Sequence, residues 1–448
     1  MAPPPKPQVF FSTTTTSTTK YTWATVALDG TGFKVEPNIP TNMDLCDLGL
    51  SGISGPANVR RDRPQAVFFG NSTTSDGEDS ITLPGGHGRL LRFYDGTHYG
   101  LAIAHPNATI DPLFDQGATT SATNSCASTY RVAVSTDGTL AAVVLVGVRV
   151  ALLKLDGTTW SGTTPASPLK EITPTGVTFT SVYQNSLTLG ATQVLFVAKN
   201  AAGNRILWSA PRDGSSVAQA IPMPQVGGNT PSYITTPLTM SADGTTFATT
   251  AGASNSKEDL IVIKGATATN VSNINDNLYN AGTLLGDSLG PQIALSTTGK
   301  YVVYGATSSA ASAYKKKAWV VKTDGTGAIE ISNSGNFVRS ASGTTDVDNY
   351  GSYLWTSDDD LLFWAGKSST SMDLFHYRVS TNALFNLTKT GTKSAAPWDG
   401  GAWESDGAWV SPTGAHVYYI AGTSSAMNII GVDTATFAKF DITTGLNI

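Results

Sequence analysis

Short runs of β-branched and aromatic residues, separated by polar turn residues, recur along most of the chain. The clearest set consists of Ile293 to Ser296, Tyr301 to Tyr304, Ala318 to Lys322 and Ala328 to Ile331. Runs of this length bounded by Gly, Asp, Ser and Thr are typical of antiparallel strands joined by tight turns. The pattern predicts a unit of four short strands. One such unit cannot bury both of its faces, so we expect several copies packed around an axis, as in a β-propeller.

A first turn marker, usually Asp-Gly followed by Thr or Ser, separates the two outer strands of each expected unit. Asp and Gly suit tight turns, because Gly accepts a positive φ and Asp can bond its own backbone. Full or weakened copies occur at Asp29-Gly30, Asp95-Gly96, Asp156-Gly157, Asp213-Gly214, Lys264-Gly265, Asp324-Gly325, Ser380-Thr381-Asn382 and Asp433-Thr434. Successive copies lie 51 to 66 residues apart. This spacing predicts eight blades.

A second marker, Ser-x-Asp-Gly or a variant of it, lies between the first two strands of a unit. It occurs at Ser135 to Gly138, Ser241 to Gly244, Ser296 to Gly299, Ser357 to Asp360 and Ser411 to Gly414. Together with Asp324-Gly325-Thr326-Gly327, this pattern resembles the TolB-like propeller repeat, most closely from Ser296 to Gly327. The resemblance implies the fold more than the function, because the repeat occurs in periplasmic binding proteins, prolyl-oligopeptidase-like enzymes and pectin-degrading lyases.

The predicted fold is all-β: a single β-propeller of four-stranded blades, with eight blades favoured and seven as the alternative. The blades are expected at residues 8–38, 42–104, 129–173, 178–222, 235–275, 291–333, 351–388 and 407–443. The first blade has only three predicted strands, and an open ring would leave two unpaired sheet edges. We therefore expect residues 445–448 to pair beside Val9 to Ser12 and close the ring.

Composition narrows the classes of partner. Charged residues make up 14% of the 448 residues, against about 25% in typical soluble domains. The net charge of −5 indicates no nucleic-acid or membrane-surface partner, and no apolar run is long enough for a membrane span. The low charge favours an extracellular, cell-surface or periplasmic location. Because the start of the chain lacks the apolar core of a signal peptide, a cytoplasmic location, a processed form and another export route stay open.

Two cysteines, Cys46 and Cys126, are the only ones in the chain. A single disulfide between them and two free buried thiols are equally weighted alternatives. Four Asn-x-Ser/Thr sequons begin at Asn71, Asn107, Asn270 and Asn386. Such triplets arise by chance in a Ser- and Thr-rich chain, so they add little to the predicted location.

The motifs that could carry catalysis are incomplete. Gly286 to Gly290 spells Gly-Asp-Ser-Leu-Gly, but a strand rather than a helix is expected after it, so the serine would not sit on a nucleophile elbow. The five histidines, among them His376 and His416, show no metal-ligand spacing. The sequence therefore predicts no catalytic residues, no metal site and no cofactor.

The densest cluster of aromatic and acidic residues lies between residues 397 and 409. The candidate ligand-binding residues are Trp398, Asp399, Trp403, Glu404 and Asp406. Flat rings cover the C–H face of a sugar and carboxylates accept its hydroxyl groups, so this set suits a glycan. The competing interpretation places the tryptophans between blades and the acids in water.

These observations lead to two functional predictions. The first is a non-enzymatic propeller that binds a protein partner as a surface or extracellular assembly component. The second is a carbohydrate-binding or polysaccharide-cleaving propeller that acts through the long loops on one face.

Overall fold

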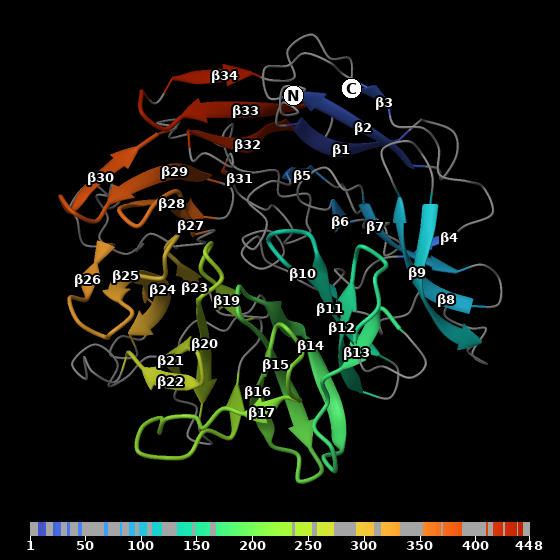
Figure 1. The fold of residues 1–448 in the computed structure, drawn as a ribbon. Helices are drawn as coiled ribbons and strands as arrows, with labels where there is room; N and C mark the ends of the chain where they lie inside the picture. Colours follow the sequence, from blue (N-terminus) through green and yellow to red (C-terminus); the bar gives the residue numbers. More distant parts are fainter. Residues whose placement is uncertain are drawn as a thin grey trace.

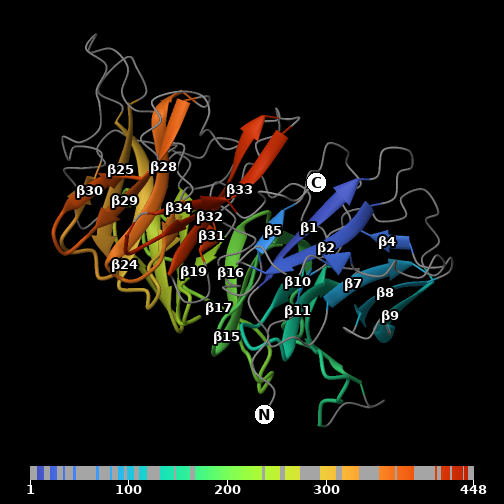
Figure 2. The same cartoon turned by 90° about the horizontal axis from the view of Figure 1, so that it is seen from above.

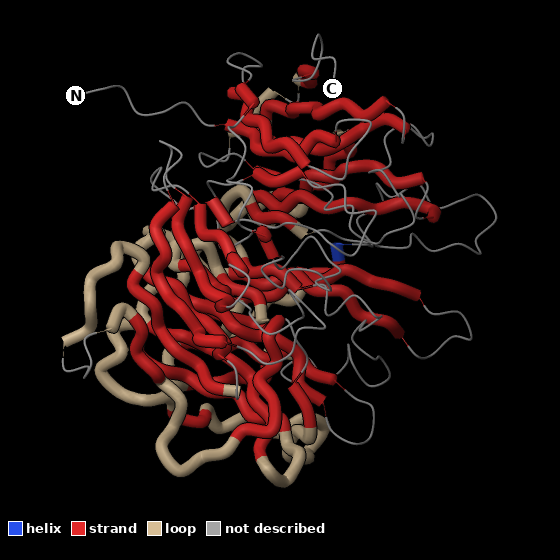
Figure 3. Tube along the Cα trace, turned by 90° about the vertical axis from the view of Figure 1, so that its right-hand side faces the viewer, coloured by secondary structure: helices blue, strands red, loops and turns tan. Residues whose placement is uncertain are grey.

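The structure is a computed structural model of the chain, and it is nearly all β (Figure 3). It describes residues 8–14, 21–27, 34–35, 44–46, 67–69, 81–82, 89–94, 98–104, 110–118, 132–145, 148–161, 167–234, 238–252, 258–272, 293–308, 315–331, 353–368, 371–387, 409–410, 415–423, 426–436 and 438–441. Within these ranges, no helix has the length and apolar character needed to cross a membrane.

The described strands form eight sheets that follow one another around a common centre (Figure 1). The first sheet has the order β3-β2-β1-β5 and contains β1 (Gln8–Thr14), β2 (Tyr21–Ala27), β3 (Lys34–Val35) and β5 (Val67–Phe69). The second has the order β4-β7-β8-β9, with β6 beside β7, and contains β4 (Asp44–Cys46), β6 (Ile81–Thr82), β7 (Arg89–Tyr94), β8 (His98–Ala104) and β9 (Ile110–Ala118).

The next three sheets are antiparallel. The third contains β10 (Val132–Val134), β11 (Leu140–Leu145), β12 (Arg149–Lys154) and β13 (Leu169–Glu171). The fourth contains β14 (Phe179–Leu189), β15 (Gln193–Asn200), β16 (Arg205–Pro211) and β17 (Gln219–Ala220). The fifth contains β18 (Tyr233–Ile234), β19 (Thr239–Met240), β20 (Thr246–Gly252), β21 (Glu258–Lys264) and β22 (Thr267–Asn270).

The last three sheets repeat one antiparallel order, with each strand beside the next in the sequence. The sixth contains β23 (Ile293–Leu295), β24 (Tyr301–Ser308), β25 (Lys315–Lys322) and β26 (Ile329–Glu330). The seventh contains β27 (Leu354–Trp355), β28 (Asp360–Ser368), β29 (Ser371–Arg378) and β30 (Ala383–Asn386). The eighth contains β31 (Trp409–Val410), β32 (His416–Thr423), β33 (Ala426–Asp433) and β34 (Lys439–Asp441). Figure 2 places the β23–β30 sheets on one side of the centre and the β4–β9 sheet on the other.

The second turn marker has one hydrogen-bonding pattern in several sheets. In the turn between β10 and β11, the buried Ser135 hydroxyl donates to Asp137 Oδ1 at 2.6 Å and accepts the amide of Leu140 at 3.0 Å. Ser241 makes the same contacts with Asp243 and Thr246. The serine thus satisfies the backbone of a tight turn without water, which explains why the turn recurs with this residue.

The apolar core is divided into clusters, each lying between two consecutive sheets. Leu152 of β12 and Phe196 of β15 belong to one cluster, in which Phe179 and Trp208 make an edge-on ring contact at 5.2 Å. Val320 of β25 belongs to another, together with residues of the β27–β30 sheet. The third to sixth sheets therefore bury both faces against their neighbours, as expected for packed blades.

Polar contacts also join neighbouring sheets through their inner turns. The pairs are Ala191 N to Gly244 O at 2.8 Å, Asp243 N to Thr297 O at 3.0 Å, Thr298 N to Asp358 Oδ1 at 2.9 Å, and an ion pair of Arg212 with Asp137. Burial raises the pKa of Asp137, but its hydrogen bonds to Ser135, Thr139 and Arg212 outweigh this and hold it well below the ordinary value. One edge of the sheets is thereby bonded together over consecutive units.

The prediction of an all-β, propeller-type fold is confirmed at this level: the described part is nearly all β and consists of several antiparallel sheets. Eight blades in a single closed ring stay a prediction. Seven first-marker turns connect the two outer strands of their sheets, but Asp95-Gly96 connects β7 and β8, which are the two central strands.

The strand predicted to close the ring is corrected. Val67–Phe69 (β5) pairs in parallel with β1, with Val9 opposite Val67 and Phe11 opposite Phe69, so it occupies the position beside β1 that was expected for residues 445–448. Those four residues lie outside the described ranges. The segment between β4 and β6 supplies β5, which pairs with the free edge of β1. The backbone groups along this edge accept any strand of suitable length, whether it comes from this segment or from the C-terminus.

Two further strand predictions differ from the structure. No strand was predicted between the blades at residues 42–104 and 129–173, yet Ile110–Ala118 forms β9 at the edge of the second sheet. The segment contains Pro112, which lacks an N–H and is tolerated on an edge strand, and register shifts around Ala102 accommodate it. The hairpin of β24 and β25 also continues beyond Tyr304, to Ser308 and back from Lys315.

Candidate functional site

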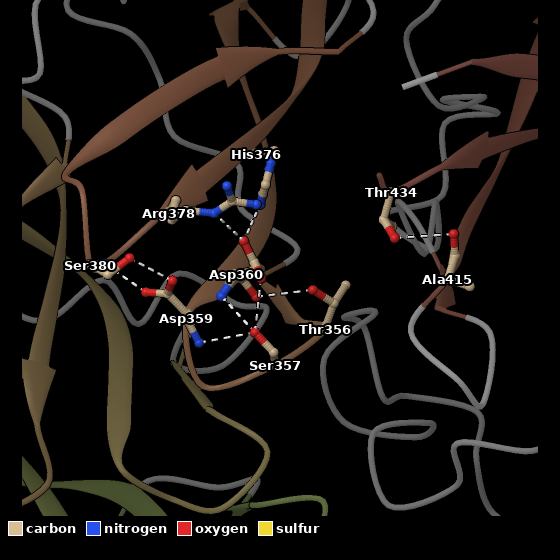
Figure 4. A network of polar contacts seen from close by, with 9 residues as sticks. All are labelled: Thr356, Ser357, Asp359, Asp360, His376, Arg378, Ser380, Ala415 and Thr434. Carbon is tan, nitrogen blue, oxygen red and sulfur yellow. Dashed lines mark hydrogen bonds and ion pairs between the residues drawn. The ribbon is translucent and has the colours of Figure 1, made fainter. Parts of the chain in front are cut away.

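A network of polar side chains lies on β28, β29 and the turn before β28. Asp360 begins β28 and pairs directly with Arg378 of β29, while Leu362 pairs with His376. Residues two positions apart on a strand share one face, so Asp360, His376 and Arg378 project to the same side of the sheet. Figure 4 shows His376 and Arg378 meeting at Asp360, with Ala415 and Thr434 of the next sheet across from them.

Asp360 uses both carboxylate oxygens in this cluster. Its Oδ1 accepts Nε2 of His376 at 2.8 Å and Nε of Arg378 at 2.9 Å. Its Oδ2 accepts the Ser357 hydroxyl at 3.0 Å. The carboxylate is held on both oxygens, so its orientation is fixed by the fold before any ligand arrives.

The two preceding aspartates serve the surrounding structure. Asp358 accepts the amide of Thr298 from the neighbouring sheet, and Asp359 accepts both the amide and the hydroxyl of Ser380 at 2.6 Å. The turn from Ser357 to Asp360 therefore links the sixth sheet, the turn after β29 and the middle of its own sheet.

Burial and hydrogen bonding act in opposite directions on the two ionisable partners. Burial raises the pKa of Asp360, but hydrogen bonds from Arg378, His376 and Ser357 outweigh it, and the net pKa lies below the ordinary value. Burial also lowers the pKa of His376, more than the contact with Asp360 raises it. At neutral pH the cluster therefore contains a charged Asp360 and a neutral His376.

The outer end of the cluster is open to solvent. The Arg378 side chain is 43% exposed, whereas the His376 side chain is only 5% exposed. Phe385 of β30 pairs with His376, stacks on its ring at 5.9 Å, and is 41% exposed. An oriented guanidinium and an exposed ring thus lie beside a buried imidazole.

The residue pairs formed by the two central strands can be compared between this sheet and the third, fifth and sixth sheets. The first pair of the two central strands is Leu140 with Lys154, Thr246 with Lys264, Tyr301 with Lys322, and Asp360 with Arg378. The third pair is Ala142 with Leu152, Ala248 with Val262, Val303 with Val320, and Leu362 with His376. The basic residue recurs in these four sheets, whereas the first central pair is Gln193 with Pro211 in the fourth sheet and His416 with Asp433 in the eighth. Relative to the third, fifth and sixth sheets, Asp360 and His376 replace uncharged and apolar residues.

The order of the contacts limits the chemistry of this cluster. In a Ser-His-Asp triad, the histidine lies between the serine and the carboxylate and can take the serine's proton. Here Asp360 lies between Ser357 and His376, so Ser357 donates to the carboxylate and not to the imidazole. The arrangement orients Arg378 and holds a buried neutral imidazole, which is a binding geometry.

The sequence-predicted site residues lie outside the described ranges. This applies to Trp398, Asp399, Trp403, Glu404 and Asp406. Cys126 lies outside as well, and Cys46 ends β4 without a described side chain, so the disulfide stays a prediction. His376 falls within the blade predicted at residues 351–388; the signal that would have singled it out is a histidine where the third, fifth and sixth sheets carry Leu152, Val262 and Val320.

The sequon at Asn270 is buried. Its side-chain nitrogen donates to Asp259 Oδ2 at 2.7 Å and to the Gln225 carbonyl at 3.1 Å, and the residue is 8% exposed. A glycosylated Asn270 would leave Asp259 buried without this donor, so the folded chain does not present this sequon as an acceptor.

No family model matches the sequence, and no curated protein does. The fold is similar to that of several solved structures at low identity. Puromycin hydrolase is 12% identical with a TM-score of 0.44, and the match covers 82% of this chain and 53% of that one. A putative TolB from Agrobacterium tumefaciens is 13% identical with a TM-score of 0.33, over 62% of this chain and 83% of that one. The propeller domain of the trilobed protease from Pyrococcus furiosus is 10% identical with a TM-score of 0.39, over 81% and 96%.

This chain spans about half the length of puromycin hydrolase. The prediction of a non-enzymatic scaffold that binds a protein partner is wrong, because the solved structures with a similar fold include puromycin hydrolase and prolyl endopeptidases, which are peptidases. The carbohydrate alternative depended on residues 397–409, most of which lie outside the described ranges, so it gains no support from the structure.

Proposed function

We propose that this chain is a TolB-like propeller of eight blades in one closed ring, and that its β27–β30 sheet binds peptides in the service of peptide hydrolysis. Eight consecutive sheets and a shared inner-turn hydrogen-bond pattern support the architecture. In this proposal β5, paired with β1, closes the ring in place of a C-terminal strand.

The observation that carries the proposed ligand is that Arg378 and Phe385 lie side by side on one face of the sheet. Arg378 lies opposite Ala383 and His376 opposite Phe385, so Arg378 and Phe385 are diagonal neighbours on one face of the sheet. Asp360 holds Arg378 through Nε, and the two Nη nitrogens bond to no side chain or carbonyl among the described residues. They are therefore available to donate to a ligand while the ring offers apolar contact.

Charge decides which acceptor suits this guanidinium at neutral pH. Asp359 and Asp360 outweigh the single charge of Arg378, and the neutral His376 adds none, so the cluster carries one net negative charge. Unit charges about 4 Å apart interact by roughly 4 kcal/mol near a protein surface, so repulsion from the two carboxylates largely cancels the attraction of Arg378 for an anion. A neutral carbonyl oxygen accepts from Arg378 without this repulsion.

A peptide offers the required combination of groups. Its main-chain carbonyls accept from Nη, and an apolar side chain of the same peptide can pack on Phe385. Because the order of Ser357, Asp360 and His376 is not that of a triad, this sheet contributes binding to peptide hydrolysis, and bond cleavage falls to groups outside the cluster.

The test is the affinity of the intact chain for short, C-terminally amidated peptides with one Phe or Leu, measured by isothermal titration calorimetry. Arg378→Gln should weaken binding at least tenfold, since hydrogen bonds to charged groups contribute about 1.5–3 kcal/mol. Phe385→Ala should weaken it several-fold. Lys322→Gln is the matched control, because Lys322 holds the same position in the sixth sheet.

The proposal fails if the unaltered chain binds no such peptide at millimolar concentration. It fails equally if Lys322→Gln weakens binding as much as Arg378→Gln does. Thermal midpoints of all three variants should stay close to that of the unaltered chain, because each replaced side chain is substantially exposed or lies at a strand end.

A further inference from the structure

One carboxylate oxygen serves both basic side chains of the cluster. Oδ1 of Asp360 accepts from His376 Nε2 at 2.8 Å and from Arg378 Nε at 2.9 Å, while Oδ2 is engaged by Ser357. The two donors therefore compete for one atom. Any change in the charge of His376 alters the interaction of Asp360 with Arg378.

The contacts define where His376 gains its second proton. A carboxylate only accepts hydrogen bonds, so the Nε2 that faces Asp360 carries the proton in the neutral imidazole. Acidification then adds a proton at Nδ1. Because burial lowers the pKa of His376, the imidazole is neutral at pH 7 and becomes charged only below its ordinary pKa of 6.5.

Protonation changes the balance of charge around Arg378. A charged His376 makes a stronger hydrogen bond with Asp360 than the neutral imidazole does, and its positive charge offsets the negative charge of the carboxylate. Asp360 therefore offsets less of the positive charge of Arg378. The cluster of Asp359, Asp360, His376 and Arg378 then changes from one net negative charge to none. Arg378 becomes a better partner for an anion while its contact with a neutral carbonyl changes little.

We propose that His376 is a positioning residue that, through Asp360, determines whether Arg378 discriminates against a free peptide carboxylate. At neutral pH the site favours amidated or internal peptide segments, and at acidic pH it also accepts a free C-terminus. This inference rests on the proposed peptide-binding function and adds a specificity that depends on proton concentration.

Among the described residues, Asp360, Arg378 and Asp359 act electrostatically on His376 from its own sheet and the preceding turn. The described strands of the neighbouring β31–β34 sheet carry the ionisable residues His416, Asp433, Lys439 and Asp441. His416 also lies near a carboxylate, at 3.8 Å from Asp433, but its side chain is 37% exposed, so it is a matched control for a histidine outside the cluster.

The experiment compares one peptide in its free-acid and amidated forms at pH 8.0 and at an acidic pH, not below about 4.5, at which NMR shows the His376 ring to be protonated. The peptide carboxylate stays charged across this range, because its pKa is about 3.5. In the unaltered chain, the ratio of Kd for the free acid to Kd for the amide should fall about fivefold at the lower pH. A change of this size is expected when one positive charge is added near the peptide carboxylate and its attraction is partly screened by water and salt. His376→Gln should keep the ratio constant, and His416→Gln should change it as the unaltered chain does.

A second measurement needs no peptide. The Nε–H signal of Arg378 in the NMR spectrum should shift with pH in step with the His376 ring, and Asp360→Asn should uncouple the two titrations. A pH-dependent ratio in His376→Gln, or an Arg378 signal that ignores the His376 titration, would overturn the inference. If the signals are coupled but no peptide binds at either pH, the proposed peptide binding is what has failed.

Discussion

The β23–β26 and β27–β30 sheets are consecutive copies of one unit, and they differ mainly where the second carries its polar cluster. Both have a basic residue in the first pair of the central strands, Lys322 in one and Arg378 in the other. The first sheet sets Tyr301 beside it and the second sets Asp360. One copy keeps apolar or aromatic residues where its neighbour has a buried histidine and a partly exposed carboxylate. This difference identifies the candidate site.

The inner turns of the same two sheets differ as well. Gly299 has a φ of 68° in the first, whereas the second runs through Asp358, Asp359 and Asp360 without a glycine. Thr298 donates to Asp358 across the boundary, so the two turns are bonded to each other. The first turn is built for close packing and the second for polar contacts.

The largest effect is expected from Asp360→Ala. This change leaves the buried His376 Nε2 without its acceptor and frees Arg378, so the free energy of unfolding should fall by about 2–3 kcal/mol. Asp324→Ala removes an exposed turn carboxylate from the sixth sheet and should cost about 1 kcal/mol or less. Urea denaturation at pH 7 measures the free energy of unfolding of both variants. Equal losses would show that the contacts of Asp360 stabilise the chain no more than those of an exposed turn carboxylate.

Gly299→Ala should have the next largest effect. Its φ favours glycine, and an added Cβ would overlap Oγ1 and Cβ of Thr246 on the neighbouring sheet, so we expect a loss of about 2 kcal/mol. Gly157 has a φ of 74° but open space around it. Gly157→Ala should therefore cost only about 1 kcal/mol, from the backbone alone. Calorimetric melting of the two variants measures both losses. The difference between them is the cost of the close contact with Thr246, beyond the cost of the positive φ.

Giving the seventh sheet the equivalent residues of the fifth and sixth sheets should leave stability nearly unchanged. The double variant Asp360→Thr with His376→Val introduces the equivalents of Thr246 and Val320 and removes the half-buried carboxylate and the buried imidazole together. Replacing both partners by uncharged groups is close to neutral, so unfolding free energy should stay within about 1 kcal/mol of the unaltered chain. A loss as large as that of Asp360→Ala would mean that the cluster itself stabilises the sheet.

The smallest effect concerns pH. The pKa of His376 is lowered in the folded chain by burial, so below pH 6.5 the unfolded chain binds the proton first and folding stability falls as pH falls. Between pH 7.5 and 5.5 the unaltered chain should therefore lose more stability than His376→Val. His416→Val should retain the full loss. Parallel slopes for the unaltered chain and His376→Val would contradict the buried, neutral imidazole.

Much of the fold could be predicted from sequence because its turns carry their own chemistry. Ser296 to Gly299 and Asp324-Gly325 fix turns by local hydrogen bonds, which depend on neighbours in the sequence. Ile110–Ala118 was missed because Pro112 weakens a strand pattern, and only pairing with β8 makes it an edge strand.

The candidate site depended on information that is not local. Asp360 meets His376 only because the hairpin of β28 and β29 sets Leu362 opposite His376. That register depends on the position of the turn between β28 and β29. From the sequence alone, Asp360 is therefore interpreted as an acidic turn residue and His376 as an unrelated histidine in a strand. Aligning the third pair of the third, fifth and sixth sheets would have shown His376 in a position that these sheets fill with Leu152, Val262 and Val320.

Hydrogen–deuterium exchange with a saturating amidated peptide tests the difference between the two sheets most directly. We expect slower exchange in Ser371–Arg378 and Ala383–Asn386, with no change in Lys315–Lys322 and Ile329–Glu330. Arg378→Gln should abolish this protection at the same peptide concentration. Equal protection of both sheets, or protection confined to other parts of the chain, would contradict the claim that Asp360, His376 and Arg378 mark the binding site.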